Sequence, residues 1–260
     1  MNEQPDLIVS PDWLAAHRDE VVLVDVRPGD QYHAGHIPGA RHIDLYPYKV
    51  RDSDPELIAE WVEAVQAAFR RIGIRNGDRV VFYEDYSGTT AARGVWLMRA
   101  LSLGEGAMLD GGLAAWVRAG HPMVTDPVET EPSDLVARLD PALLATASDV
   151  LEAARNDGTI VDTRADLEWM QGTIPTARHL EWIHHLQPDG TLKPIQELRA
   201  MYEQLGLAPS EEVITFCASG YRAAHTWLVL TLLGYDNVRN YAPSWGEWGR
   251  RPDLPIAPTR

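Results

Sequence analysis

The chain of 260 residues contains a single cysteine, Cys217. One cysteine forms no internal disulfide and has no partner cysteine for a structural zinc site, so the composition favours a reducing compartment. We therefore expect a cytoplasmic location. The chain also lacks an apolar run approaching the roughly 20 residues that span a bilayer. Residues 1–10 carry acidic and amide side chains where a secretory signal needs positive charge followed by an apolar stretch, so no such signal is expected.

Positive charge is scarce, with 23 Lys and Arg against 38 Asp and Glu and a formal net charge of -15. Nucleic acids and anionic membrane surfaces are therefore not expected as partners, because both bind clustered Lys and Arg. With 45% hydrophobic residues and a mean hydropathy of -0.24, the composition is otherwise that of an ordinary soluble protein.

The chain contains an internal repeat. Residues 23–45 match residues 160–182 at a constant offset of 137, and residues 80–92 match residues 212–224 at an offset of 132. The identities at the first offset are Val24/Val161, Asp25/Asp162, Arg27/Arg164, Gly35/Gly172, Ile37/Ile174, Pro38/Pro175, Ala40/Ala177, Arg41/Arg178 and His42/His179. A repeat of this length indicates a duplicated domain, because solenoid repeats have periods of about 20 to 50 residues.

Two domains are therefore expected, over residues 1–124 and 142–260. The intervening stretch 125–141 is rich in proline and acids and lacks periodicity, which predicts a linker.

Each half alternates short β-branched runs with longer helical patterns, which is typical of a parallel sheet with crossover helices. The predicted fold is α/β, with two tandem domains that each hold a mainly parallel sheet flanked by helices. Strands are expected near residues 21–26, 41–44, 79–84 and 107–110, and near 159–163, 178–180, 212–216 and 237–240. Helices are expected after a cap at Ser10, over residues 55–71, and from about Tyr221.

Cys217 stands between an apolar strand pattern and a short loop of small residues. Ligands of α/β proteins bind beyond the carboxyl ends of the strands. Backbone N–H groups of a tight loop and of the first helical turn stabilise negative charge there, and such sites bring a cysteine pKa down to roughly 3.5 to 7.5. The pattern predicts a reactive thiolate that needs no adjacent histidine.

Three motifs resemble the two-domain rhodanese sulfurtransferases over essentially the whole chain. They are an Asp-x-Arg followed by Gly-His-Ile-Pro-Gly-Ala at residues 35–40, the C-x-x-G loop at Cys217, and a near match to a terminal Gly-Ser-Trp-x-Glu-Trp at residues 243–248. The resemblance implies that Cys217 takes the outer sulfur of thiosulfate or 3-mercaptopyruvate as a persulfide. It then passes this sulfur to cyanide or a thiol.

Residues found in only one half are the better candidates for chemistry. Cys217 aligns with Asp85 at the offset of 132, so the first domain is expected to be catalytically silent, and Arg222 aligns with Thr90. Arg222 is thus the side chain expected to bind the donor, with the amides of the loop as anion stabilisers. The loop residues are Ala218, Ser219, Gly220, Tyr221 and Arg222.

The shared arginines of the repeat are expected to be structural and to pair with carboxylates. This group contains Arg27, Arg164, Arg41 and Arg178, and Arg164 is also a supporting residue of the site. Glu168 and Arg222 occur together where the first half has Gln31 and Thr90. We therefore expect an ion pair at the rim of the loop that leaves the guanidinium partly free for a donor oxyanion.

The donor is left open by the sequence. Vertebrate thiosulfate-type enzymes have Arg and Lys after the cysteine, and another Arg where this chain has Glu168. The neutral pair Ala218 and Ser219 is closer to the mercaptopyruvate-type loop, but that loop ends in Thr where this chain has Arg222.

Two other classes of function remain as alternatives. An arginine after a cysteine resembles the C-x5-R cradle of cysteine-dependent phosphatases and arsenate reductases, but only four residues separate Cys217 from Arg222. A sulfur carrier or interaction module without enzymatic activity is the other.

No metal or organic cofactor is implied. The adjacent pair His184 and His185 lacks a suitably spaced third ligand and is interpreted as solvated loop. His36 is expected to be structural. Of the nine tryptophans, several in helical patterns are expected in the core, namely Trp61, Trp96, Trp116 and Trp227. Trp245 and Trp248 are candidate walls of the pocket.

Overall fold

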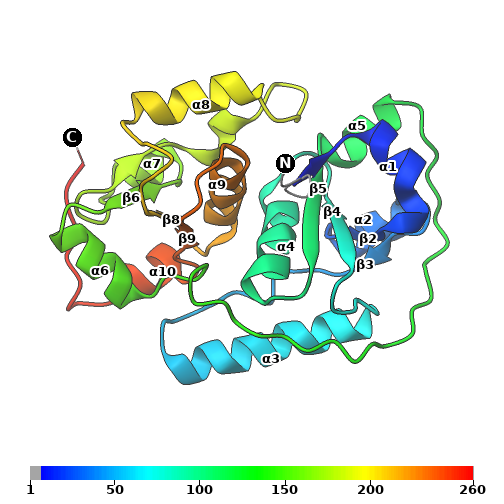
Figure 1. Ribbon diagram of the computed structural model, residues 1–260, viewed down its shortest axis with the longest axis horizontal. Helices are drawn as coiled ribbons and strands as arrows, with labels where there is room; N and C mark the ends of the chain where they lie inside the picture. Colours follow the sequence, from blue (N-terminus) through cyan, green and yellow to red (C-terminus); the bar gives the residue numbers. More distant parts are fainter. Residues whose placement is uncertain (1–6, 260) are drawn as a thin grey trace. The chain divides into compact units, whose positions relative to one another are not determined.

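The computed structural model describes residues 7–259, which form two compact units, each around its own sheet (Figure 1). The first unit contains the residues up to Tyr48 together with Glu60–Asp140 and Leu186–Leu192. The second contains Lys49–Ala59, Pro141–His185 and the residues from Lys193 onward. Residues 1–6, part of the stretch searched for a secretory signal, lie outside the described residues.

The first unit holds a five-stranded parallel sheet in the order β1-β5-β4-β2-β3. Its strands are β1 (Ile8–Val9), β2 (Val22–Asp25), β3 (Arg41–His42), β4 (Arg79–Tyr83) and β5 (Glu105–Leu109). Its helices are α1 (Pro11–His17), η1 (Arg18–Glu20), α2 (Gly29–Ala34), α4 (Thr89–Ala100) and α5 (Gly112–Arg118), and α3 (Pro55–Arg71) ends in this unit.

Alternation along β4 places helices on both faces of this sheet. Tyr83 packs with α1 and α5 in one apolar cluster, whereas Phe82 faces α4, where Gly94 allows the helix to approach closely. The N-cap at Ser10 forms as expected, with its Oγ accepting from the N–H of Trp13 at 3.2 Å.

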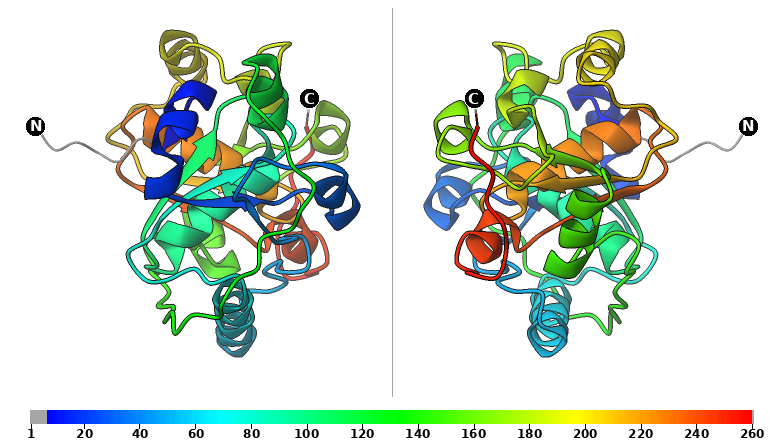
Figure 2. Two further views of the ribbon diagram at one scale, coloured as in Figure 1. Left: turned by 90° about the vertical axis from the view of Figure 1, so that its right-hand side faces the viewer. Right: turned by 90° about the vertical axis from the view of Figure 1, so that its left-hand side faces the viewer.

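The second unit repeats this arrangement with a four-stranded parallel sheet in the order β7-β6-β8-β9 (Figure 1 and Figure 2). Its strands are β6 (Thr159–Asp162), β7 (Arg178–His179), β8 (Val213–Phe216) and β9 (Val238–Asn240). Its helices are α6 (Ala147–Arg155), α7 (Asp166–Trp169), η2 (Trp182–His185), α8 (Ile195–Gln204), α9 (Tyr221–Leu232) and α10 (Ser244–Trp248).

The predicted tandem α/β fold is confirmed. All eight expected strands form, and α3 has the predicted bounds. The short strand β1 was not expected, and it pairs with β5 at the edge of the sheet. In the second unit a single parallel bridge between Leu144 and Asn240 takes the corresponding edge place. Within residues 7–259 no helix is both long and apolar enough to cross a membrane.

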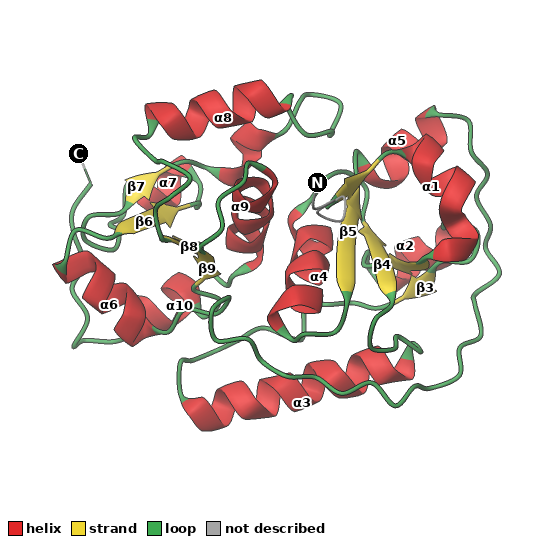
Figure 3. Cartoon of the chain, in the orientation of Figure 1, coloured by secondary structure: helices red, strands yellow, loops and turns green. Residues whose placement is uncertain are grey.

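The stretch predicted as a linker contains no helix or strand from 125 to 140 (Figure 3). It is nevertheless fixed to the first unit. Leu135 is fully buried, its carbonyl accepts from Arg70 Nε at 2.6 Å, and the Asp140 N–H donates to the Ala100 carbonyl at 2.8 Å. The domain boundaries at 124 and 142 stay a prediction about the duplicated sequence, whereas the first compact unit extends to Asp140.

The two halves of the sequence exchange equivalent segments. Residues 186–192 belong to the first unit, where the Ser87 N–H donates to the Gly190 carbonyl at 2.9 Å and the Leu192 N–H donates to Asp110 at 2.9 Å. Residues 49–59 belong to the second unit in the same way. There the Ser53 hydroxyl donates to Glu247 at 2.7 Å. Each unit is therefore completed by a segment from the other half of the chain.

Candidate functional site

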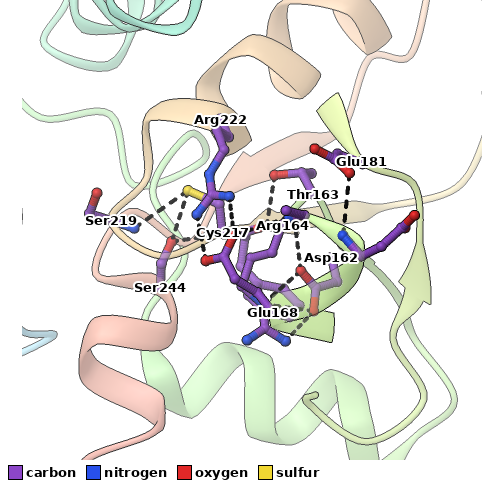
Figure 4. Close-up of polar contacts among 12 residues, drawn as sticks. Asp162, Thr163, Arg164, Glu168, Glu181, Cys217, Ser219, Arg222 and Ser244 are labelled. Atoms are coloured by element: carbon purple, nitrogen blue, oxygen red, sulfur yellow. Dashed lines mark hydrogen bonds and ion pairs between the residues drawn. The ribbon is translucent and has the colours of Figure 1, made fainter. Parts of the chain in front are cut away.

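Cys217 directly follows β8 and lies within the loop that starts α9, as the strand pattern predicts. Its side chain is 1% exposed. The sulfur accepts from the N–H of Gly220 at 3.1 Å and from the N–H of Ser219 at 3.4 Å (Figure 4). These two amides point their partial positive charge at Sγ, so they stabilise negative charge on a thiolate or on a sulfur attached to it.

The backbone of this loop is held by the segment that starts α10. The N–H of Trp245 donates to the Cys217 carbonyl at 2.9 Å, and the N–H of Gly246 donates to the Ala218 carbonyl at 2.9 Å. The Cys217 N–H donates to the Ser244 hydroxyl at 3.1 Å, and that hydroxyl donates to the Tyr241 carbonyl at 2.7 Å. The position of the sulfur is therefore fixed by backbone contacts on both sides of the cysteine.

Gly220 is required where the loop joins α9. Its φ of +83° lies in the left-handed region, and a β-carbon there would stand 2.5 Å from the Ala242 carbonyl oxygen. The Gly220 carbonyl also accepts from the Asn240 side chain at 3.0 Å. No other residue type allows this turn to approach β9 so closely.

The expected ion pair between Glu168 and Arg222 is present. The two guanidinium Nη atoms bind the two carboxylate oxygens in bidentate fashion, with Nη2 to Oε1 at 2.9 Å. Figure 4 shows the guanidinium beside the sulfur of Cys217, with the Glu168 carboxylate on its other side. Two of the five N–H donors of Arg222 serve the pair, so donors remain for a bound anion.

The electrostatics of the pair follow from these contacts. The hydrogen bond from Arg222 holds the pKa of Glu168 below its ordinary value, against the opposing effect of burial. Burial alone would lower the pKa of Arg222, but Glu168 and the Cys217 sulfur together raise it. Arg222 is therefore a permanent cation within interaction range of the sulfur.

Arg164 supports the site from below, as the repeat predicts. Its guanidinium forms an ion pair with Asp162 at 2.6 Å and donates to the Gly172 carbonyl at 2.7 Å. It also lies 4.1 Å from the centre of the Trp245 ring, so Arg164 fixes the residue whose amide binds the Cys217 carbonyl. Arg27 forms the equivalent pair with Asp25 in the first unit.

The expected alignment of Cys217 with Asp85 is wrong. Asp25 pairs with Tyr83, and the equivalent Asp162 pairs with Phe216, so the residue that follows β4 and corresponds to Cys217 is Glu84. Five residues separate β4 from α4, against four between β8 and α9. A gapless alignment at the offset of 132 matches the first residues of α4 and α9, so it cannot account for the extra residue between β4 and α4.

Glu84 fills the place of the nucleophile with its own carboxylate. Its Oε1 accepts from the N–H groups of Thr90 at 2.7 Å and Ala91 at 3.0 Å, at the start of α4. A β-carbon on Gly88 would stand only 2.5 Å from the same oxygen. Burial raises the pKa of Glu84 to about 7, although both amide bonds act in the opposite direction. The first unit therefore keeps a turn whose amides bind a carboxylate, but the chain's single cysteine lies in the second unit.

Two other predictions need correction. Arg41 and Arg178 do not pair with carboxylates; each donates through Nη1 to carbonyls just beyond a helix, Ile72 after α3, and Leu205 and Gly206 after α8.

His185 is fully buried, not solvated: burial, then His225, keeps its pKa well below the ordinary value. Its Nε2 lies 2.7 Å from the Tyr202 hydroxyl, and its ring stacks on that of His225. His184 is exposed, and within residues 7–259 no group of three His, Cys, Asp or Glu side chains could hold a metal ion.

The sequence assigned no role to Ser244 and Asn240, both fully buried against the loop. Ser244 has a φ of +58°, which is unusual for a residue with a β-carbon. Ser244 lies inside the motif 243–248, but the motif did not indicate that this residue binds the Cys217 amide. Trp248, a candidate wall of the pocket, is instead fully buried in the core of the second unit. His36 is buried, with its Nδ1 at 2.9 Å from the Tyr32 carbonyl oxygen.

The chain matches the family model described as Rhodanese-like domain over residues 10–119 and again over residues 146–251. The two matches correspond to the two halves of the internal repeat.

Two relatives and one solved structure align with nearly the whole chain. The chain is 31% identical over 280 residues to the sulfur carrier protein TtuD of Thermus thermophilus, with 97% of each chain covered. It is 33% identical over 279 residues to a thiosulfate sulfurtransferase of Corynebacterium glutamicum, covering 97% of this chain and 90% of that one. The crystal structure of SseA, a 3-mercaptopyruvate sulfotransferase from Escherichia coli, superposes with a TM-score of 0.82 at 29% identity, covering 93% of this chain and all of the other.

Proposed function

The chain belongs to the rhodanese family of sulfurtransferases, and on that premise we propose that Cys217 is the residue that carries the transferred sulfur. One observation carries the proposal: Sγ accepts two loop N–H groups while a permanent cation, Arg222, lies beside it. Both features stabilise an anionic sulfur, first as the attacking thiolate and then as the persulfide.

The first half-reaction is a displacement at sulfur. A lone pair of the Cys217 thiolate forms a bond to the outer sulfur of thiosulfate, the S–S bond within the donor breaks, and its electron pair leaves with sulfite. The terminal sulfur of the persulfide then carries the negative charge. The amides of Ser219 and Gly220 already donate to Sγ, the atom to which this sulfur is attached, so they stabilise negative charge on the persulfide group.

The second half-reaction regenerates the enzyme. The carbon of cyanide, or the sulfur of a thiolate acceptor, attacks the outer sulfur of the persulfide. The S–S bond to Cys217 breaks, and its electron pair returns to the cysteine as thiolate. No oxidant, reductant or metal is consumed in either step.

We propose thiosulfate as the preferred donor. The oxyanion group of thiosulfate is bonded directly to the transferred sulfur, whereas the carboxylate of 3-mercaptopyruvate lies two carbons farther away. A cation that lies beside Sγ fits the nearer anion, and Arg222 is so placed (Figure 4). The partial neutralisation of Arg222 by Glu168 leaves a guanidinium that binds the donor and can release sulfite.

Steady-state sulfite release from thiosulfate in the presence of cyanide tests the proposed role of Cys217. The parent protein should turn over, and mass spectrometry after thiosulfate alone should show one added sulfur atom on Cys217. Cys217→Ser should show neither. Turnover that survives in Cys217→Ser would refute the assignment of the nucleophile.

We further propose a cytoplasmic location, supported by the dependence of this chemistry on a reduced thiol at Cys217. Fractionation of cells followed by trapping of free thiols on the recovered protein tests it.

A further inference from the structure

We propose that the physiological acceptor is a cysteine of a polypeptide, and that apolar and basic residues beside this cysteine dock on the acceptor surface, defined as Leu167, Met170 and Asp166. The proposal rests on the sulfur-carrying role of Cys217. It names the partner that receives sulfur from the same site.

The acceptor surface contains the two most exposed large apolar side chains of the described residues. Leu167 is 74% exposed and Met170 is 70% exposed. They are three residues apart in and just after α7, so they share one side of the turn. A third exposed apolar side chain, Ile256, lies beside Gly172, two residues after Met170, because a β-carbon on Gly172 would stand 2.9 Å from its Cγ2.

This surface is continuous with the catalytic site. Glu168 lies between Leu167 and Met170, and its carboxylate binds Arg222 beside Cys217. The side chain that forms one edge of the sulfur site therefore comes from the same helical turn that displays the apolar groups. A polypeptide docked on the acceptor surface would therefore contact the turn whose Glu168 binds Arg222.

Small acceptors do not account for these exposed groups. Cyanide has no apolar surface to bury, and a small thiol such as glutathione is polar and anionic. Cys217 is 1% exposed, so an acceptor sulfur must enter a narrow site while the atoms attached to it remain at the rim. A cysteine within a polypeptide brings neighbouring side chains to that rim, where burial of apolar area stabilises the complex.

The charge of the rim specifies the partner further. Asp166 is exposed beside Leu167, and Glu181 lies near it, with Oε2 accepting from the Asp166 N–H at 3.3 Å. His179 faces the Asp166 carboxylate at 3.6 Å. The rim therefore complements a lysine or arginine, in a chain whose net charge of -15 repels acidic partners at longer range.

The test uses the full-length protein loaded with sulfur from thiosulfate and freed of excess donor. Two synthetic peptides of equal length and charge each carry one cysteine and one lysine, with leucines beside the cysteine in the first and serines in the second. The peptide thiolate attacks the outer sulfur, Cys217 leaves as thiolate, and the peptide persulfide is quantified by mass spectrometry. Cyanide turnover is measured in parallel.

The leucine peptide should react about tenfold faster than the serine peptide with the parent protein. In the double variant Leu167→Ser, Met170→Ser this ratio should fall to about one, with cyanide turnover unchanged. The single variant Leu167→Gln should give an intermediate ratio. Val117→Ser, which removes an exposed apolar side chain of the first unit, is the matched control and should keep the parent ratio.

Equal rates for the two peptides, or a ratio that the double variant retains, would overturn the proposal. It would also be overturned if the parent is a dimer by sedimentation and the double variant is a monomer, because the surface would then bind a second copy. Cyanide turnover of the parent protein reports separately on the role of Cys217, since cyanide needs no docking surface.

Discussion

Replacing Arg222 by threonine should weaken the reaction with thiosulfate more than the reaction with 3-mercaptopyruvate. Threonine is the residue that the first unit has at the equivalent position, Thr90. The change removes the guanidinium beside the sulfur and leaves Glu168 without its cation. Both consequences weaken binding of the dianionic thiosulfate, because the attraction to the guanidinium is lost and the unpaired Glu168 carboxylate repels the donor.

The magnitude follows from the geometry of the pair. A charge-assisted hydrogen bond to a bound anion contributes about 1.5 to 3 kcal/mol, which corresponds to a loss of roughly 10- to 150-fold in kcat/KM for thiosulfate. The Glu168 side chain is 38% exposed, so solvent screens its repulsion, and we assign that part only about 1 kcal/mol. For 3-mercaptopyruvate, whose carboxylate lies farther from the transferred sulfur, the loss should stay below about tenfold.

Steady-state kinetics with each donor, using cyanide as acceptor, measure these losses. The double variant Arg222→Thr, Glu168→Gln reproduces the Gln31 and Thr90 pair of the first unit, and it should recover about fivefold over the single variant because the unpaired carboxylate is gone. Arg155→Thr, which removes an exposed arginine of α6, controls for net charge. If Arg222→Thr leaves both donors unaffected, or if the double variant recovers nothing, the reasoning about this pair is wrong.

Three further predictions concern the frame around the site. Gly220→Ala should lower the free energy of unfolding by at least about 2 kcal/mol and abolish most of the activity. The control Gly234→Ala, at φ +88° but with no atom near the added β-carbon, should lower it by only about 1 kcal/mol. Denaturant unfolding compares the two variants, and equal losses would show that the Ala242 carbonyl plays no part. Because the pKa of Glu84 is raised, its contribution to stability is complete below its ordinary pKa of 4.5 and is lost as the pH rises through about 7. Between about pH 5 and pH 8, the free energy of unfolding should fall by about 1 to 3 kcal/mol more in the parent than in Glu84→Gln. Parallel stability profiles of the two proteins would contradict this. The lowered pKa of His185 gives the opposite pH dependence, because its contribution to stability is complete above its ordinary pKa of 6.5 and is lost as the pH falls. The decrease in melting temperature on acidification below pH 6.5 should therefore be smaller in His185→Phe than in the parent. An unchanged decrease would exclude the buried histidine as its cause.

Much of the fold could be predicted because each element depends on local pattern. The strands follow short β-branched runs, and α3 follows the apolar spacing of residues 55–71. Cys217 could be located for the same reason, since it stands at a predicted strand end. The ion pair between Glu168 and Arg222 could be predicted because the first half has Gln31 and Thr90 at the two matching positions. A chain with a single domain would not allow this comparison.

The errors arose where a long-range contact decides the outcome. The extra residue in the first loop is set by which strand residues pair, and a gapless comparison of sequences contains no strand pairing. His185 is buried because α8 and α9 bring Tyr202 and His225 to it, although its neighbour His184 is exposed. Arg178 binds a helix end that lies 27 residues away in sequence. None of these partners is marked by a local pattern.

The exchange of segments 49–59 and 186–192 bears on how the chain can be dissected. A gene fragment cut in the stretch 125–141 would encode neither compact unit completely. The amino-terminal fragment would leave Asp110 without the Leu192 amide, and the carboxy-terminal fragment would leave Glu247 without Ser53. Because each unit needs a segment from the other copy, the copy without the cysteine remains necessary as half of the scaffold. The two fragments are accordingly suited to complementation on co-expression and unsuited to use as separate modules.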